Sequence, residues 1–173
     1  MRKKYKPATV KVLFVAESPP FSSDDRFFYN RDQESRDYLY RSVMEAVFPN
    51  FKFKENGRGR KDEWLRKFME HGYYMIDATD SPVNQLTPAK RRSMIEGSVA
   101  TKLSEIAALV CKNTPILLVK KNVFEAFKEP LRCAGFNVIN TSFLPFPSHG
   151  HQDRFIKDCR SYLKSALKSL KTA

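Results

Sequence analysis

Residues 10–20 read VKVLFVAESPP and contain the clearest structural signal in the chain. The first seven positions are β-branched and almost continuously apolar, which is typical of a strand buried on both faces of a parallel sheet. The two prolines that follow can neither continue a sheet nor enter a helix interior, so the chain leaves the sheet as a rigid loop. Glu17 and Ser18 stand at this exit. We therefore expect polar chemistry at the end of a buried strand.

Strands alternate with helices along the rest of the chain. Further strands are predicted at 73–77, 115–119 and 136–140. Helices are predicted at 35–48, between Asp62 as N-cap and Gly72, from Pro88 to Val110 with Thr87 as the cap, at 122–133, and around 155–170. This order predicts a three-layer α/β/α sandwich with a four-stranded, mostly parallel sheet and right-handed crossovers.

Ligands of such sheets bind beyond the carboxyl ends of the strands. In this chain those ends lead into loops that begin at Glu17, Asp77, Lys120 and Thr141. We expect the functional residues to lie in these four loops.

A length of 173 residues suits a single domain that covers residues 1–173, with residues 1–9 as a basic N-terminal tail. No apolar stretch approaches the roughly 20 residues that a membrane-spanning helix needs, and the first residues lack the pattern of a signal peptide. We therefore expect a soluble, cytoplasmic protein without a membrane partner. We also expect a monomer.

The three cysteines are Cys111, Cys133 and Cys159. An odd number without Cys-x-x-Cys spacing favours neither a disulfide framework nor a metal site. Each cysteine has apolar neighbours in a predicted helix, so we expect all three to be buried thiols. The sequence predicts no cofactor and no metal.

Basic residues outnumber acidic ones, with 31 Lys and Arg against 19 Asp and Glu and a net charge of +12. They gather at 2–6, 52–61 and 90–92. An excess of this size, together with the Gly-Arg-Gly-Arg stretch at 57–60, favours a polyanionic partner, and nucleic acid first. The alternative is that the charge only keeps the protein soluble.

The chain lacks the glycine-rich motifs of dinucleotide-binding and P-loop proteins and the nucleophile elbow of α/β-hydrolases. Instead, four short motifs follow the predicted strands: 16–20 (AESPP), 27–29 (FFY), 75–84 (MIDATDSPVN) and 146–148 (FPS). In order and spacing they resemble the uracil-DNA glycosylase superfamily over about residues 10–165. The resemblance implies a single α/β/α domain that flips a uracil out of DNA and hydrolyses its N-glycosidic bond.

Glu17 matches the carboxylate that one branch of this superfamily carries at the strand end, and Ser18 takes the place of a water-positioning Asp in another branch. By this resemblance Glu17 is catalytic: it would orient the attacking water and stabilise the cationic sugar. Ser18 would contact the base, and Phe28 matches the ring on which the flipped base stacks. The alternatives are that Glu17 caps backbone amides in a proline-rich turn and that the aromatic run 27–29 anchors the core.

Two positions depart from the family pattern. Asp77 stands where the family has an Asn that reads uracil, and an ionised carboxylate cannot donate as an amide does. This argues for a base that offers an amino donor, for lost base recognition, or for a protonated Asp77. Phe146 replaces the His that stabilises the departing base anion. His149, which we predict to be the second catalytic residue, or His151 would supply that role from the same loop, unless they cap the next helix or are solvated.

Contacts to the DNA backbone are predicted for Ser148, Gly150 and Arg154. The iron–sulfur branch of the superfamily needs four cysteines, and this chain has three. The resemblance therefore implies a cofactor-free protein whose partner is DNA with a damaged or deaminated base.

Three functions are compatible with these residues. The first is a DNA base-excision glycosylase-like protein, and the second is a nucleic-acid-binding protein of the same fold without glycosylase activity. The third is a small-molecule hydrolase that uses Ser18 with His149, for which the sequence lacks a nucleophile elbow. Asp77 and Phe146 leave open whether the protein is an enzyme.

Overall fold

A computed structural model describes residues 1–21, 27–33, 36–148 and 150–169. Its sheet has three parallel strands in the order β2-β1-β3, which are β1 (Val12–Ala16), β2 (Tyr73–Asp77) and β3 (Ile116–Leu118). Every residue of the central strand β1 is buried. The prediction that this stretch forms a strand covered on both faces is therefore confirmed.

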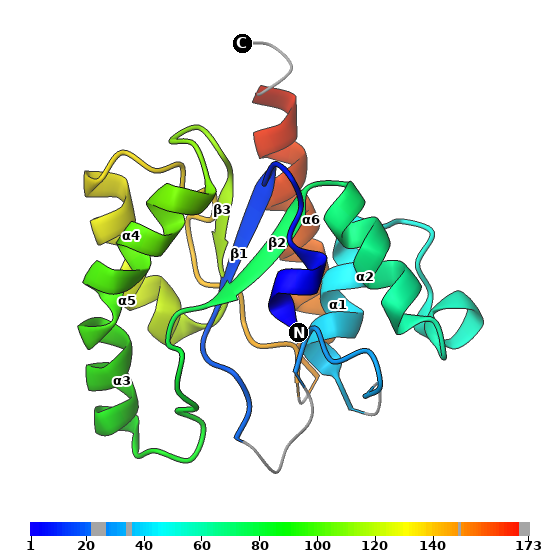
Figure 1. The fold of residues 1–173 in the computed structure, drawn as a ribbon, viewed down its shortest axis with the longest axis horizontal. Coiled ribbons are helices and arrows are strands. Elements are labelled where there is room, and N and C mark those ends of the chain that lie inside the picture. Colours follow the sequence, from blue (N-terminus) through cyan, green and yellow to red (C-terminus); the bar gives the residue numbers. More distant parts are fainter. Residues whose placement is uncertain (22–26, 34–35, 149, 170–173) are drawn as a thin grey trace.

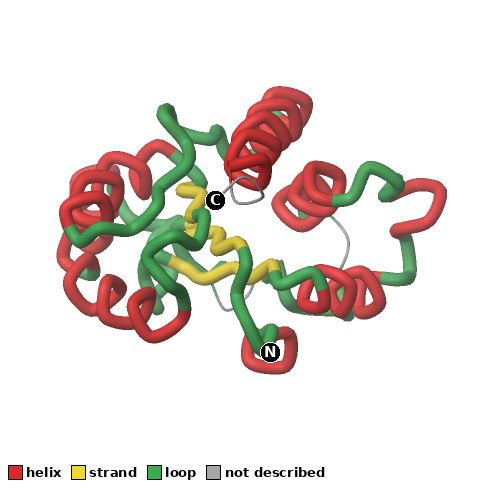
Figure 2. The backbone as a smooth tube through the Cα atoms, turned by 90° about the horizontal axis from the view of Figure 1, so that it is seen from above, coloured by secondary structure: helices red, strands yellow, loops and turns green. Residues whose placement is uncertain are grey.

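Helices cover both faces of the sheet, as Figures 1 and 2 show. α3, α4 and α5 lie on one side, and α1, α2 and α6 lie on the other. No helix in the described part of the chain is long and apolar enough to cross a membrane. The bounds are η1 (Arg2–Tyr5, a 3₁₀ helix), α1 (Tyr38–Val47), η2 (Phe53–Gly57, a π-helical turn), α2 (Lys61–Glu70), α3 (Pro88–Gly97), α4 (Val99–Leu109), α5 (Lys121–Cys133) and α6 (Gln152–Ser169).

The prediction of a fourth strand at 136–140 is wrong for the described structure, which has only three strands. This segment forms one isolated bridge with the β3 region, between Ile116 and Val138, and a second bridge joins Val119 to Leu144 farther along the chain. Between the bridges, a side chain takes the place of a strand backbone. The Asn140 amide accepts a hydrogen bond from Leu118 N at 3.0 Å through Oδ1 and donates one to Leu118 O at 3.1 Å through Nδ2. The backbone N–H and C=O of Leu118 at the edge of β3 thus have hydrogen-bond partners without a continuous fourth strand.

Replacing Asn140 by Ala should leave the buried Leu118 N–H and C=O without these partners. At roughly 1–3 kcal/mol for each of the two unsatisfied groups, we expect the free energy of unfolding to fall by about 2–6 kcal/mol in urea denaturation. Asn137→Ala is the matched control, because Asn137 is exposed and lies on the same segment. Equal losses in the two variants would contradict the role of the Asn140 amide.

Two helix predictions also need correction. The stretch from Pro88 to Val110 forms two helices, which meet at Ser98. The Ser98 hydroxyl oxygen lies 2.7 Å from both Ala78 O and Ile95 O, which share its single O–H donor, so it ties the break to the loop after β2. At the start of α3 the prediction is confirmed, since Pro88 is the first helical residue and Thr87 accepts a hydrogen bond from Lys90 N.

Asp62 does not cap α2, because the helix begins one residue earlier. Its carboxylate instead accepts hydrogen bonds from the Tyr5 hydroxyl, from Lys4 Nζ at 2.8 Å and from Arg66 Nε at 2.8 Å. Tyr5 is 2% exposed. The predicted N-terminal tail is therefore not a free extension, since its residues Arg2–Tyr5 form η1 and are anchored on α2.

The cysteines differ from one another in burial. Cys159 is buried as predicted, whereas Cys111 and Cys133 are exposed, so that part of the prediction is wrong. Cys133 is the last residue of the amphipathic helix α5 and Cys111 follows the end of α4. Residues at such helix ends leave the core side even when their neighbours are apolar.

One buried ion pair fastens the loop before α1 to α2. Lys61 Nζ lies 2.6 Å from Asp37 Oδ2, and both side chains are almost inaccessible to solvent. Lys61 also donates to the Gln33 carbonyl oxygen at 2.8 Å. The other oxygen of Asp37 accepts from Tyr40 N and so caps α1. A single lysine thus holds the loop that follows Phe28 in place.

Removing this lysine should be costly because it leaves a buried carboxylate uncompensated. We expect Lys61→Met to lower the free energy of unfolding by about 3–5 kcal/mol. Lys67→Met is the control, because the ion pair of Lys67 with Glu63 is solvent-exposed and such pairs contribute about 0–1 kcal/mol. Urea denaturation of both variants measures the difference, and a loss in Lys61→Met no larger than in the control would count against the pair.

Candidate functional site

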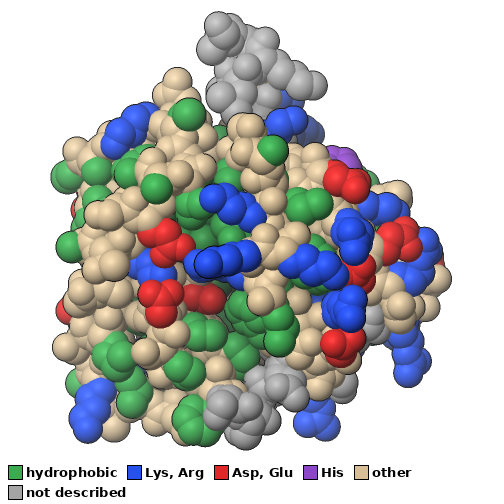
Figure 3. Space-filling model, viewed as in Figure 1, with side chains coloured by type: hydrophobic (Ala, Val, Ile, Leu, Met, Phe, Trp, Pro, Cys, Tyr) green, Lys and Arg blue, Asp and Glu red, His purple; other side chains and the backbone are tan. Residues whose placement is uncertain are grey.

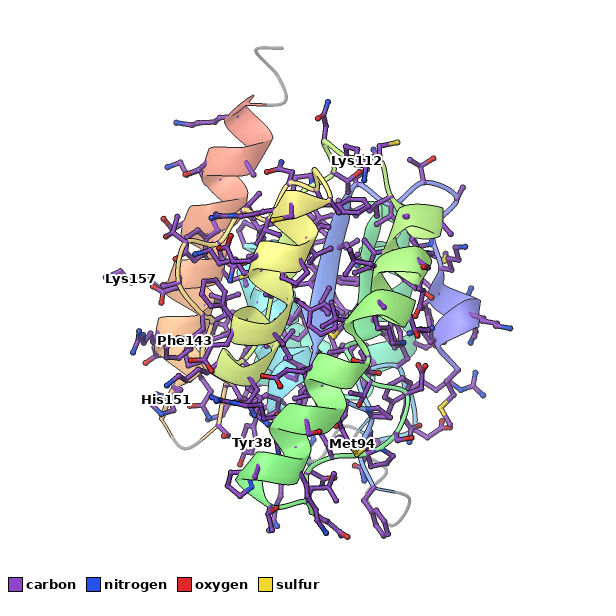
Figure 4. All side chains as sticks on the ribbon, turned by 90° about the vertical axis from the view of Figure 1, so that its left-hand side faces the viewer. Tyr38, Met94, Lys112, Phe143, His151 and Lys157 are labelled. Carbon is purple, nitrogen blue, oxygen red and sulfur yellow. The ribbon has the colours of Figure 1, made fainter. Side chains whose placement is uncertain are left out.

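A pocket of about 340 Å³ lies at the carboxyl ends of the strands. In Figure 4, Tyr38 from its lining and His151 lie at the lower end of the molecule, and Lys112 lies at the opposite end. Most of the pocket wall is apolar. The lining consists of Ala16, Glu17, Ser18, Pro19, Pro20, Phe27, Phe28, Tyr29, Arg36, Asp37, Tyr38, Leu39, Met75, Asp77, Asn84, Lys120, Phe146 and Ser148. Segments that are far apart in the sequence therefore meet in one hollow.

Glu17, directly after β1, is the carboxylate of this pocket and is only 7% exposed. Lys120 Nζ forms an ion pair with its Oε2, and Asn122 Nδ2 donates to its Oε1 at 3.2 Å. Each carboxylate oxygen has room for about two hydrogen bonds, so both can still accept one from a further donor. The carboxylate is held in one orientation while part of its acceptor capacity stays open.

The backbone of this pocket is strained at two positions. Among the described residues, only Arg36 (φ 55°) and Lys120 (φ 80°) are non-glycine residues with positive φ, and both line the pocket. Such conformations cost of order 1–3 kcal/mol and cluster at functional sites. Both residues are cations. This pattern does not depend on any motif, and it supports the choice of this pocket as the candidate functional site.

Asp77, the last residue of β2, has a strongly perturbed carboxyl group. Burial raises its pKa from 3.8 to about 7. The charges of Arg2 and Lys102 lower the pKa, and those of Asp80 and Glu105 raise it, but burial is the largest cause. Close to neutral pH the group is therefore divided between its ionised and its neutral form.

The cations near Asp77 are already paired with other acids. Arg2 Nη2 lies 2.9 Å from Glu105 Oε1, and Lys102 Nζ lies 2.6 Å from Asp80 Oδ1 and 2.8 Å from Glu105 Oε2. Lys102 itself is 1% exposed. Because these positive charges are largely offset by their own partners, burial decides the ionisation of Asp77.

Two phenylalanines of the pocket differ in how much of their ring a ligand can reach. Phe28 is 4% exposed and packs against Tyr29 and Phe68, with ring centroids 4.9 and 5.4 Å apart. Phe146 is 38% exposed, and Lys120 Nζ lies 5.5 Å from its ring centroid. Phe28 thus belongs both to the pocket wall and to the core, while Phe146 offers a more accessible aromatic face.

The other predicted site residues are divided between the pocket and its surroundings. Ser18 and Ser148 line the pocket, and the Ser18 hydroxyl accepts a weak hydrogen bond from Val83 N at 3.4 Å. Gly150, with φ +85°, is exposed and does not belong to the described lining. Arg154 lies on α6, also away from that lining, and pairs with Asp158 at 3.5 Å. His149 lies outside the described residues.

Sequence reasoning assigned no role to Lys120, Asn122 and Arg36, although Lys120 was predicted to begin a loop at a strand end. Lys120 and its partner Glu17 lie 103 positions apart in the sequence, and a positive φ in a charged residue has no sequence pattern that predicts it.

Among the described residues, no group of three or more His, Cys, Asp or Glu side chains is placed to hold a metal ion.

The raised pKa of Asp77 makes a prediction about stability. Between pH values of about 4 and 7 the folded protein holds a proton that the unfolded chain has released, so the free energy of unfolding falls as pH rises, by at most about 1.4 kcal/mol per pH unit. Asp77→Asn should remove this decline, whereas Asp153→Asn, at an exposed position, should keep it. Urea denaturation across this pH range tests the assignment, which parallel curves for wild type and Asp77→Asn would refute.

Comparisons of this chain with protein-family models, with curated proteins and with solved structures found no match. What the pocket does must therefore be inferred from its own geometry and chemistry.

Proposed function

We propose that the protein binds DNA and hydrolyses the N-glycosidic bond of a damaged or deaminated base that is flipped into this pocket. The observation that carries the proposal is convergence. Glu17, Ser18, Phe28, Asp77 and Ser148, which come from three separate segments of the chain, line one hollow at the strand ends. The parallel strands bring their exit loops to one edge of the sheet, and the support for the proposal is that the residues matched by the resemblance line the same pocket there.

The pocket suits a small planar ring with polar edges. Its volume of about 340 Å³ is at the lower end of the range of ligand pockets, about 300–1,000 Å³. A base that enters it can stack on the accessible face of Phe146, and base–aromatic stacking contributes about 1–3 kcal/mol. Phe28 would close the pocket from the core side.

Asp77 would read the edge of the base in its neutral form. A protonated carboxyl group has one O–H donor and one carbonyl acceptor, the same pair of functions that an Asn amide presents. With a pKa of about 7, this form is well populated at neutral pH. The replacement of the family's Asn by Asp77 is therefore compatible with a base that offers a carbonyl beside an N–H.

The hydrolytic step would use the Glu17–Lys120 pair. Glu17 takes a proton from a water molecule whose oxygen forms a bond to C1′ of the sugar, while the bond between C1′ and the base nitrogen breaks and the base departs with the electron pair. The proton then passes from Glu17 through solvent to the released base anion. The Lys120 ammonium, next to Phe146, stabilises the negative charge on the departing base. Lys120 would thus supply the role for which Phe146 lacks the chemistry.

Lys120 provides the sharpest test of this mechanism. We expect Lys120→Met to slow base release by at least about tenfold, at the lower end of what a single polar catalytic group contributes. Lys121→Met is the matched control, because Lys121 is the adjacent residue but is exposed and pairs with Glu125 at 3.6 Å. Base release is measured on duplexes with uracil, hypoxanthine, xanthine or a thymine mismatch, followed by alkaline cleavage of abasic sites.

The same assay defines the failure of the proposal. If the wild-type protein releases none of these bases but still binds the duplexes in a salt-sensitive manner, the glycosylase function is wrong. Equal rates for Lys120→Met and Lys121→Met would remove Lys120 from the mechanism.

One observation favours nucleic-acid binding without base release as the second candidate function. The charges of Glu17 and Lys120 offset one another, so this carboxylate stabilises a cationic sugar less than a free one would. A protein of this kind would hold an extruded base without cutting its glycosidic bond, and the assay above separates the two functions.

A further inference from the structure

A second hollow, of about 830 Å³, is lined mainly by cations. It lies between the loop that follows Phe28, helix α1 and the π-helical turn η2. Four of its eight lining residues are Lys or Arg, and one of these, Arg31, pairs with the single carboxylate, Asp32, at 3.5 Å. Its lining consists of Arg31, Asp32, Gln33, Arg41, Phe53, Lys54, Arg58 and Gly59. Figure 3 shows how Lys and Arg atoms gather on the half of the visible face where η1 and α2 lie, interspersed with Asp and Glu atoms.

Most basic residues close to this hollow are used within the protein. Arg60 pairs with Glu63 through two hydrogen bonds of 2.8 Å, and Lys61 is buried against Asp37. By contrast, Lys54 and Arg58 are exposed and have no ion-pair partner within the described part of the chain. Their positive charge is therefore available to a ligand.

The segment that carries these two cations is pre-organised. Asn56 Oδ1 accepts from Lys52 N at 2.9 Å, Asn56 Nδ2 donates to Asn50 O at 2.8 Å, and Trp64 Nε1 donates to Asn56 O at 2.9 Å. At Gly57 a Cβ would lie 2.7 Å from the Phe51 ring, so the turn closes tightly on the core. π-helical turns are rare in proteins, and those that occur are often found at functional sites.

The wall of the hollow combines charge with a flat aromatic surface. The Arg41 guanidinium carbon lies 3.6 Å from the ring centroid of Phe53, which holds the guanidinium plane in place. Gly59, at the end of the same turn, has φ +73°, a backbone conformation that favours glycine.

We propose that this hollow is a phosphate-binding groove that holds the backbone of a nucleic acid strand next to the flipped nucleotide. The groove and the pocket share one loop: Arg31 and Gln33 face the groove, and Phe28 and Arg36 face the pocket. A strand that places one base in the pocket would lay its neighbouring phosphates along Lys54 and Arg58. The proposal rests on the proposed function for the identity of the partner, but not for catalysis.

The test measures binding of a fluorescently labelled, undamaged DNA oligonucleotide by anisotropy at several salt concentrations. The double variant Lys54→Gln/Arg58→Gln removes two groove cations. We expect the slope of log K against log salt to become shallower by about 1.5–2, since each lost phosphate contact changes it by about 0.7–1. The control Arg132→Gln/Lys164→Gln removes two exposed cations near the far ends of α5 and α6, and its slope should equal that of the wild type.

Three outcomes would overturn the groove. They are an unchanged slope in Lys54→Gln/Arg58→Gln, an equal change in the control variant, and displacement of the oligonucleotide by a polyglutamate peptide as effectively as by unlabelled DNA. Because the oligonucleotide carries no damaged base, the result does not depend on base release. If the double variant shows the expected shallower slope but the wild-type protein releases no base, the groove is supported and the glycosylase function is wrong.

Discussion

The ion pair between Glu17 and Lys120 joins the loops that leave two neighbouring parallel strands, and the geometry of the pocket depends on it. β1 and β3 end side by side, so opposite charges placed directly after them hold their exit loops together. Lys120 has a positive φ of 80°. The same contact orients the Glu17 carboxylate, while the Lys120 ammonium lies 5.5 Å from the centroid of the Phe146 ring on the wall of the pocket.

Two further buried lysines form ion pairs with carboxylates near the pocket end of the sheet. Lys61 with Asp37 fastens the loop in front of α1, and Lys102 with Asp80 and Glu105 surrounds the end of β2. These lysines contribute to the net charge of +12 but are not available to a partner. The net charge alone therefore does not locate a binding surface, because only the cations without an ion-pair partner inside the protein are available to a ligand.

Local patterns predicted the parts of the fold that depend on local chemistry. The apolar run that forms β1 and the Thr87–Pro88 start of α3 are examples, because burial on both faces and helix capping act over a few residues. The amide of Asn140 replaces a strand, and the Ser98 hydroxyl fixes a helix break, through contacts about 20 residues away in sequence. For the site, the motifs predicted several residues that line the pocket, but not Lys120 as the partner of Glu17.

The arrangement of the cysteines has a practical consequence for attaching the protein to a surface. Cys111 and Cys133 are exposed near Lys112, at the end of the molecule remote from the pocket. Burial raises the pKa of the third thiol, Cys159, to about 12, so little of it is present as the reactive thiolate. A maleimide linker would therefore tether the chain by one end and leave the strand ends facing the solution.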